Sequence, residues 1–410
     1  MAMSSIYGTP LPDSLTMSTP PARIDSQEPR HFTSSRSAGA SQLTVEDRMS
    51  TDEGRQRASA KSSGTARQYR RIAVEEAFLP PELMKLYLRM IADGTADDPG
   101  FVSLWGFYGG EEGARTTRVL QRIQNLGQQR IADMDATGID MQILSLSCPG
   151  VQIFDAPTAT ALAHSSNDFL AAAIRKYPTR FAGLAAVAPQ DPAAAARELA
   201  RGVQELGLKG AIVNSHTHDE YLDLPKFWEI FEAAESLGVP LYLHPNTPSR
   251  QLIQPLLERG LEGAIFGFAV ETGLHLLRII TSGVFDRFPK LQIVVGHLGE
   301  ALPFWLFRID FMHRRAVAGH RYPTLRKLER TPSEYLRSNV CVTTSGMAWE
   351  PAILFAHSVL GPDRLMYAMD YPYQYVPEEV AVTDHLPISL EDIRKLYQLN
   401  AERVFRLNEK

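Results

Sequence analysis

The sequence predicts an α/β protein of the (β/α)8 TIM-type barrel class, and three features carry that prediction. Short apolar segments recur along residues 71–410, and segments with helical spacing of apolar residues lie between most of them. Most of the short segments are apolar throughout, as expected for parallel strands buried on both faces. No glycine-rich phosphate turn follows the first segment, where residues 75–78 read EEAF, which disfavours a doubly wound open sheet.

The expected strands are short apolar runs that we place, in chain order, at 72–74, 141–146, 181–187, 211–214, 240–244, 291–297, 340–344 and 365–369. The expected helices place apolar residues three and four positions apart, at 157–176, 192–206, 225–237, 271–284 and 302–317. Pro157, Pro192 and Pro225 fall in a first helical turn, where proline is tolerated. Gly207 and Gly238 follow helices, as C-terminal glycines do.

Residues 1–70 differ from the rest in composition. Of these, 29 are Ser, Thr, Pro or Gly and only seven are Ile, Leu, Val or Phe. Such a stretch cannot bury enough apolar surface to offset the entropy of ordering it. We therefore expect a disordered N-terminal extension at 1–70, dispensable rather than a targeting signal, and a single barrel domain at 71–410.

Charge and cysteine usage limit the partners and the compartment. The net charge of −5 gives no overall basic field, so we expect no nucleic-acid partner, and no apolar run is long enough for a membrane span. Two cysteines, Cys148 and Cys341, cannot form a disulfide framework and indicate a reducing compartment, for which we expect the cytoplasm. We also expect a homo-oligomer, either a dimer or a tetramer.

Polar residues gather where the expected strands end, which is where a barrel of this class has its active site. In strand order they are Glu75 and Glu76, Asn214, His244, His297, the group Thr343 to Ser345, and Asp370. One Glu, one His and one Asp in the same barrel mouth form a set of nitrogen and oxygen ligands for a divalent ion. Taken singly, each histidine could be structural and Asp370 could cap a helix; the combination favours a site.

Four motifs in this pattern resemble the amidohydrolase-related superfamily. They are IAVEEAF at 72–78, YLHP at 242–245, GHLGEALPFW at 296–305 and DYPY at 370–373. Within the superfamily they are most similar to the non-oxidative aromatic acid decarboxylases, such as the 2,3-dihydroxybenzoate and γ-resorcylate decarboxylases. The resemblance covers about residues 71–407.

The resemblance implies roles for individual residues. Glu75, His244 and Asp370 match the metal ligands, and Asp370 also matches a proposed proton carrier. His297 matches a histidine that faces the substrate, and Glu300 matches its carboxylate partner.

Two further residues are expected to bind substrate. Arg308 matches an arginine associated with substrate anion binding, and Asn214 ends the fourth strand. We expect one divalent metal ion, zinc first, with manganese or magnesium as alternatives, and a small aromatic acid as substrate.

Ala77 departs from many relatives, which carry a second metal-binding histidine two residues after the first carboxylate. Residues i and i+2 of a strand face the same way, so both could reach one ion. Alanine leaves three protein ligands and more open positions, which makes a two-metal hydrolase unfavourable. The 2,3-dihydroxybenzoate decarboxylases share this Glu-Glu-Ala-Phe form.

The expected reaction is decarboxylation of an ortho-hydroxy aromatic acid that chelates the metal through its carboxylate and ortho oxygen. Asp370 would protonate the ring, and His297 with Glu300 would hold the phenolic oxygen. A metal-dependent hydrolase of an amide, ester or lactone, with Asp370 as base, is the alternative. A metal-free binding protein is a third interpretation, disfavoured by the combination of Glu75, His244, His297 and Asp370.

Aromatic residues Trp105, Phe107 and Tyr108 stand among glycines between the first two expected strands. We expect a loop here that covers a planar substrate, and a surface loop or a subunit contact is the alternative.

Overall fold

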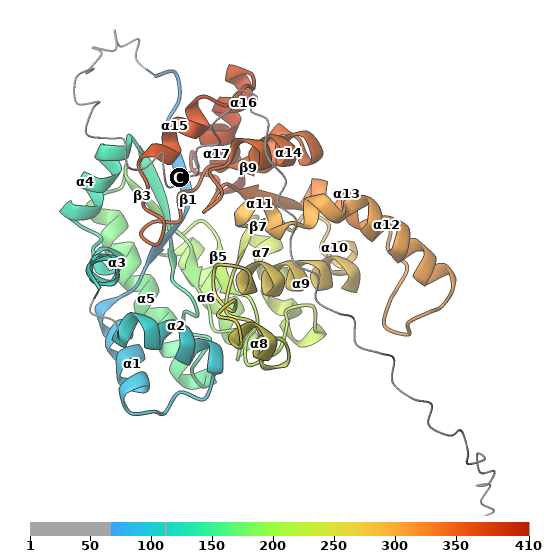
Figure 1. Cartoon of the computed structure of the whole chain (residues 1–410), viewed down its shortest axis with the longest axis horizontal. Helices are drawn as coiled ribbons and strands as arrows, with labels where there is room; N and C mark the ends of the chain where they lie inside the picture. The colour runs from blue at the N-terminus through green and yellow to red at the C-terminus, as the bar shows by residue number, and fades with distance from the viewer. Residues whose placement is uncertain (1–66, 111–112, 410) are drawn as a thin grey trace, which may run out of the picture. The chain divides into compact units, whose positions relative to one another are not determined.

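Parallel strands surrounded by helices make up the fold in a computed structural model that describes residues 67–110 and 113–409 (Figure 1). The extension expected at 1–70 lies outside the described residues, except for 67–70. One sheet contains β1 (Ile72–Phe78), β2 (Met141–Leu146) and β3 (Phe181–Gly183). The other contains β4 (Ala185–Ala186), β5 (Ala211–Asn214), β6 (Leu241–His244), β7 (Ile293–Val295), β8 (Val340–Thr343) and β9 (Leu365–Met366).

Backbone hydrogen bonds join the two sheets into a closed barrel. Only Leu184 separates β3 from β4, and its N–H donates to the carbonyl of Leu144 on β2 at 2.9 Å. At the other edge, the N–H of Val74 on β1 donates to the carbonyl of Tyr367, just after β9, at 3.0 Å. With β3 and β4 counted as two parts of one strand, the eight expected strands are present, and the barrel prediction is confirmed.

Helices connect the strands. Between β1 and β2 lie α1 (Pro81–Ala92), α2 (Pro99–Gly110), α3 (Ala114–Gln124) and α4 (Gln128–Thr137). The next are α5 (Ala156–Lys176), α6 (Pro192–Gln204), α7 (Trp228–Leu237), α8 (Arg250–Leu257), α9 (Gly267–Ser282) and α10 (Val284–Arg287). Then come α11 (His297–Glu300), α12 (Leu302–Ala318), α13 (Pro332–Asn339), α14 (Glu350–Leu360), α15 (Glu378–Asp384), α16 (Leu390–Arg394) and α17 (Asn400–Val404).

Local chemistry explains where several helices begin and end. Asp155 accepts a hydrogen bond from the N–H of Thr158 at 2.8 Å and thereby caps α5. Asp191 caps α6 in the same way, through the N–H of Ala194 at 2.9 Å. Gly238 ends α7 with a φ of 66°, a conformation that glycine adopts without strain.

Some boundaries differ from those expected. The first strand runs on to Phe78, whereas β7 stops at Val295 and leaves His297 in a separate turn. The expected loop around Trp105 is wrong: residues 99–110 form α2, because Trp105 buries its indole against Tyr87, with ring centroids 4.7 Å apart. Among the described residues, no helix is long and apolar enough to cross a membrane.

Candidate active site

Glu75 lies at the centre of the barrel mouth and is 2% exposed. Its Oε2 accepts hydrogen bonds from the hydroxyls of Tyr242 and Thr343, the latter at 2.9 Å. Its Oε1 is buried and has no hydrogen-bond donor. Gly296 makes this placement possible, because a Cβ there would lie 2.6 Å from Oε2. The carboxylate is therefore fixed by one oxygen and leaves the other free.

His244 ends β6 and points its Nε2 at that free oxygen, 3.5 Å away. Its Nδ1 lies 2.8 Å from the carbonyl oxygen of Pro245, which can only accept, so Nδ1 carries the proton. Burial lowers the pKa of His244, although Glu75 opposes the shift. The neutral imidazole then presents a lone pair on Nε2 to the carboxylate Oε1, and two acceptors face each other in a buried site.

His297 and Glu300 form a hydrogen-bonded pair in the turn after β7. The Nδ1 of His297 donates to Glu300 Oε1 at 2.7 Å, and its Nε2 lies 3.8 Å from Glu75 Oε1. Residues 297–301 all have positive φ, between 50° and 82°, so the chain makes a left-handed turn with only one glycine in it. Such backbone is strained for non-glycine residues and is found mostly at functional sites.

The charges around His297 raise its pKa. Burial alone would lower the value, but Glu300, Glu75 and Asp370 together raise it to about 10. The imidazolium therefore compensates part of the negative charge at the barrel mouth.

Asp370 follows β9 and shares this mouth. Asp370 and His297 both lie beside Gly346. A Cβ at Gly346 would be 3.9 Å from Asp370 Oδ2 and 3.5 Å from His297 Cδ2. Burial raises the pKa of Asp370 to about 8, and the nearby Glu75 adds to the rise. The structure thus brings together Glu75, His244, His297 and Asp370, as the sequence predicts.

The donor set fits a divalent cation. Glu75 Oε1 is buried without a hydrogen-bond donor, and His244 Nε2 lies 3.5 Å from it, so a cation bound to both atoms would satisfy them. Metal–ligand bonds of about 2.1 Å would separate two ligands of one ion by roughly 3–3.5 Å. Within residues 67–110 and 113–409, no group of three His, Cys, Asp or Glu side chains is arranged to hold a metal ion, so the geometry shows this pair of ligands alone.

Replacing Tyr242 with phenylalanine tests how Glu75 is held. The variant keeps the ring but removes one of two donors to Glu75 Oε2. Residues that orient a metal ligand typically change affinity by about 10- to 100-fold when mutated, so Mn²⁺ affinity should fall within that range. Isothermal titration calorimetry measures this, and unchanged affinity would show that Thr343 alone is sufficient.

Asn214 also lies beside the candidate ligands, and Arg308 does not. Asn214 pairs in register with His244 across β5 and β6, and its buried Oδ1 has no hydrogen-bond partner. Arg308 is exposed on α12 and forms no hydrogen bond or ion pair with another residue that the structure describes. Within a single chain, therefore, only Asn214 of the two expected substrate-binding residues joins the cluster.

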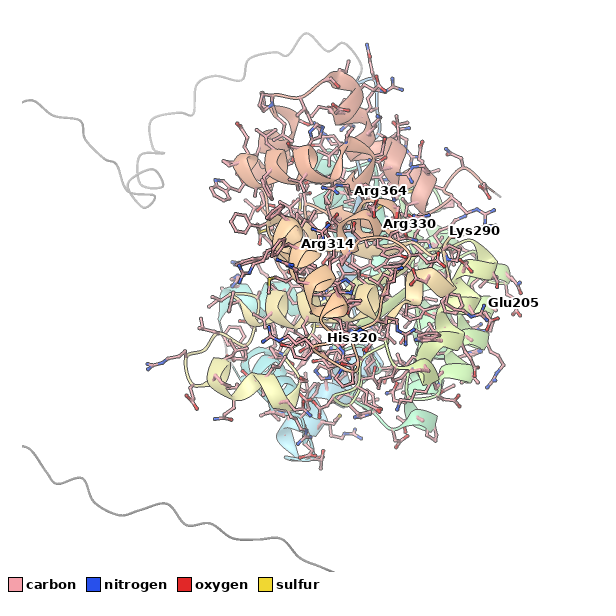
Figure 2. The ribbon with its side chains drawn as sticks, turned by 90° about the vertical axis from the view of Figure 1, so that its right-hand side faces the viewer. Glu205, Lys290, Arg314, His320, Arg330 and Arg364 are labelled. Carbon is pink, nitrogen blue, oxygen red and sulfur yellow. The ribbon has the colours of Figure 1, made fainter. Side chains whose placement is uncertain are left out.

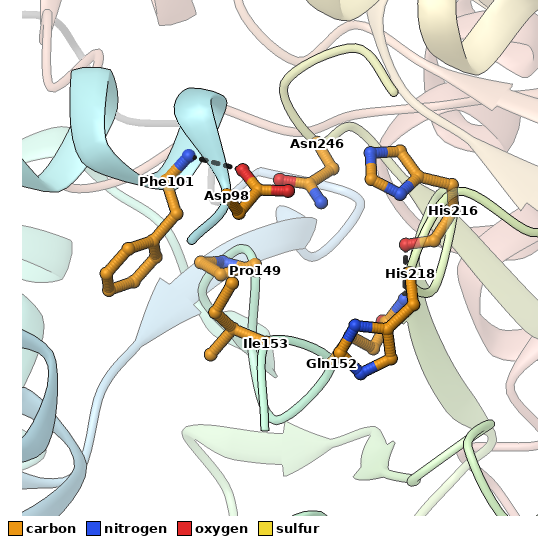
Figure 3. Close-up of a pocket in the computed structure, with 8 residues that line it drawn as sticks. All are labelled: Asp98, Phe101, Pro149, Gln152, Ile153, His216, His218 and Asn246. Atoms are coloured by element: carbon orange, nitrogen blue, oxygen red, sulfur yellow. Dashed lines mark hydrogen bonds between the residues drawn. The ribbon is translucent and has the colours of Figure 1, made fainter. Parts of the chain in front are cut away.

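Two cavities lie near the barrel mouth. The first, of about 20 Å³, has room for little more than a water molecule (Figure 3). It is lined by Asp98, Phe101, Pro149, Gln152, Ile153, His216, His218 and Asn246, and by none of the candidate ligands. The second, of about 170 Å³, lies between α2 and α3. Its Arg115 donates to the carbonyl of Tyr373 at 3.3 Å, so this cavity borders the loop that carries Asp370.

Sequence reasoning did not find the groups that hold the site in place. Tyr242 lies two residues before His244 and so on the same face of the strand, a spacing that could have identified it. Glu271 on α9 is fully buried and accepts from the Ser215 hydroxyl at 3.0 Å and from the N–H of Ser249 at 3.1 Å. It thereby ties the loop after β5 to the loop after β6, a contact that no local motif reveals.

Together, the closed barrel and the polar cluster at the C-terminal ends of its strands define a metal-dependent barrel enzyme. The amidohydrolase family profile matches residues 119–407, which is more than half of the chain. The chain belongs to the amidohydrolase family.

Several proteins to which this chain is similar are decarboxylases. A γ-resorcylate decarboxylase from Polaromonas sp. is 37% identical over 295 residues, which cover 70% of this chain and 89% of the relative. A solved 5-carboxyvanillate decarboxylase from Novosphingobium aromaticivorans, complexed with manganese and 4-hydroxy-3-methoxy-5-nitrobenzoic acid, is 55% identical, with a TM-score of 0.82. That match covers 84% of this chain and 97% of the solved one.

A third relative is the dihydroxybenzoic acid decarboxylase from Polaromonas sp., solved with manganese and the inhibitor 2-nitroresorcinol. It is 33% identical, with a TM-score of 0.73 and coverage of 83% of this chain and 98% of that one. These relatives confirm the prediction of a decarboxylase over the hydrolase alternative. Their bound manganese also supports one divalent metal ion as the cofactor.

Proposed function

We propose that this chain is a metal-dependent, non-oxidative decarboxylase of an ortho-hydroxy aromatic acid. The observation that carries the proposal is the pair formed by Glu75 Oε1, which is buried without a hydrogen-bond donor, and His244 Nε2, 3.5 Å away from it; a cation would satisfy both atoms. The relatives supply the reaction class, since they decarboxylate aromatic acids.

Glu75, His244 and Asp370 are the proposed metal ligands. Zinc is the ion expected from the sequence, and the manganese in the relatives makes Mn²⁺ the first alternative to test, followed by Mg²⁺. When bound, the cation supplies Lewis acidity and a template for the substrate's carboxylate and ortho oxygen. Asn214, with its free Oδ1 beside His244, is a proposed substrate contact.

Asp370 and the His297–Glu300 pair are the proposed acid–base groups. Asp370 gives its proton to the ring carbon that bears the carboxylate. The bond from that carbon to the carboxylate then breaks, its electron pair returns to the ring, and carbon dioxide leaves. His297, held by Glu300 at 2.7 Å, donates to the phenolic oxygen and stabilises the charge on it. Asp370 recovers its proton from solvent.

The proposed substrate has the substitution pattern of 5-carboxyvanillate. The relative that acts on this compound shares 55% identity with the chain, against 33% for the dihydroxybenzoate enzyme. Dihydroxybenzoates are the alternative substrates. We also propose a cytoplasmic location, on the two cysteines that are both free and buried.

Arg308 is proposed to contact the substrate of a second copy of the chain. Helix α12 reaches the edge of the described unit (Figure 1), and Figure 2 faces this side, with Arg314 and His320 turned to the viewer. Around Arg308 the helix exposes aromatic side chains, with Phe304 71% and Phe307 86% exposed. An apolar surface of this kind is typical of an interface, which agrees with the expected homo-oligomer.

Replacing Arg308 with alanine should raise KM by about 10- to 100-fold without changing Mn²⁺ affinity, because a charged hydrogen bond to substrate is lost. Co-expression of Arg308→Ala with His244→Ala should restore turnover, since one site of each mixed dimer then has intact ligands and the partner copy's arginine. If light scattering shows that each variant alone still forms dimers, but the co-expressed protein does not recover turnover, Arg308 lies outside the substrate site.

A substrate panel tests the proposed reaction. The purified protein, loaded in turn with Mn²⁺, Zn²⁺ and Mg²⁺, should release carbon dioxide from 5-carboxyvanillate and more slowly from 2,6- and 2,3-dihydroxybenzoate and salicylate. Aryl esters and amides serve as the hydrolase controls and should remain intact. Hydrolysis of these controls without any release of carbon dioxide would contradict the proposal.

A further inference from the structure

Glu76 lies next to Glu75 on β1, but its side chain points away from the barrel mouth and is fully buried. Its Oε1 accepts a hydrogen bond from the N–H of Met369 at 2.9 Å, and its Oε2 accepts from the N–H of Tyr371 at 3.3 Å. These two amides are the neighbours of Asp370 on either side. One carboxylate therefore holds the backbone on both sides of a proposed catalytic residue.

Asp370 needs such support because its φ is 68°, in the left-handed region that non-glycine residues avoid. β9 ends at Met366, so the amides beyond it have no strand partner. The amide of Ala368 donates to the Thr344 hydroxyl at 3.1 Å, and the amides of Met369 and Tyr371 donate to Glu76. Side-chain oxygens thus accept from these amides, while the carbonyl of Tyr371 still accepts from the N–H of Ala77 on β1 at 2.7 Å.

Glu76 is itself held firmly. Gln142 on β2 donates to its Oε2 at 3.2 Å, and the Oε1 of Gln142 accepts from Arg130 at 3.3 Å. The Arg130 guanidinium lies over the Tyr371 ring at 4.4 Å, and the Tyr371 hydroxyl donates to Asp133 at 2.7 Å. These buried polar contacts therefore form one connected network next to Asp370. Such a network makes the backbone that it contacts more rigid.

We infer that Glu76 is a positioning residue that fixes the backbone of Asp370, so that β1 governs the site from both of its faces. Glu75 acts inside the barrel as a ligand, and Glu76 acts outside it through the amides of Met369 and Tyr371. The inference rests on the proposed role of Asp370.

Replacing Glu76 with glutamine tests this. The variant keeps the shape of the side chain, but its NH2 group faces one of the two amide donors and cannot accept from it. We expect kcat and Mn²⁺ affinity each to fall by about 10- to 100-fold, with KM little changed, because the metal-facing carboxylate of Asp370 is displaced. Steady-state kinetics and electron paramagnetic resonance of free Mn²⁺ give these values.

Glu198→Gln is the matched control. Glu198 is also a buried carboxylate, bonded to Asn167 at 2.7 Å between α5 and α6 and remote from the proposed ligands, so its amide variant should retain wild-type kcat and Mn²⁺ affinity. If Glu76→Gln folds poorly by thermal melt, Glu76→Asp replaces it; this side chain is too short to reach both amides and should show the same loss.

A double-mutant cycle separates positioning from general stability. If Glu76 acts through Asp370, adding Glu76→Gln to Asp370→Ala, which has no ligand side chain at this position, should leave Mn²⁺ affinity as in Asp370→Ala alone. An equal loss of affinity in both backgrounds, or wild-type values for Glu76→Gln, would overturn the inference. If neither the wild type nor any variant decarboxylates an aromatic acid, the proposed function fails. The double-mutant cycle measured by Mn²⁺ affinity would still test the role of Glu76.

Discussion

Replacing His244 with alanine should abolish metal binding at the barrel mouth and lower decarboxylation by at least about 1,000-fold. His244 Nε2 lies 3.5 Å from Glu75 Oε1, and removing it leaves that oxygen without a co-ligand. The charge stabilisation that a metal supplies amounts to several kcal/mol, and about 4 kcal/mol corresponds to a factor of roughly 1,000 in rate. Metal content by mass spectrometry and single-substrate kinetics measure the two effects.

His275→Ala is the control for this variant. His275 is also fully buried; its Nε2 accepts from the N–H of Leu222 at 2.9 Å and its Nδ1 lies 3.3 Å from the Ser215 hydroxyl, so it contacts the loop after β5 and is not a proposed ligand. Its loss should cost stability and leave the metal content unchanged. A His244→Ala protein that retained one metal ion per chain would place the metal site elsewhere.

Replacing Asp370 with asparagine should lower kcat by about 100- to 10,000-fold, the range that general acid–base groups contribute. Asparagine keeps the shape of the side chain and one metal-binding oxygen, but it carries no transferable proton. We therefore expect folded protein with weakened Mn²⁺ binding and a KM close to that of the wild type. The wild type should also place one solvent deuteron on the product ring in D2O, as mass spectrometry of the product would show.

Asp223→Asn provides the comparison for Asp370→Asn. Asp223 pairs with Arg278 at 2.8 Å, away from the proposed ligands, and its amide variant should keep wild-type kcat. If Asp370→Asn retained more than a tenth of the wild-type turnover, the proton carrier would have to be another residue, and His297 would be the first to test.

The barrel could be predicted because each of its strands is buried on both faces and so carries its own apolar run. The bounds of β2 and β5 agree with the expected 141–146 and 211–214, where the apolar run and the strand coincide. The end of β7 was harder to delimit. β7 stops two residues before His297, because the chain enters a left-handed turn there, and apolar periodicity does not report backbone handedness.

The inward-facing site residues could be predicted because strand ends and residue chemistry are both visible in the sequence. The structure places Glu75, His244, His297 and Asp370 together, as expected. The role of Glu76 on the outward face of β1 could not be predicted, because its partners are backbone amides nearly 300 residues away in the chain. Their position depends on barrel closure between β1 and the end of β9, which no local pattern encodes.

Metal titration of decarboxylation tests the central claim most directly. Protein stripped with a chelator and given 5-carboxyvanillate should release no carbon dioxide. Activity should rise with added Mn²⁺ until one ion per chain is bound and then stay constant. Turnover that persists in the stripped protein, or that never appears with Mn²⁺, Zn²⁺ or Mg²⁺ at full occupancy, would contradict a metal-dependent decarboxylase built on Glu75, His244 and Asp370.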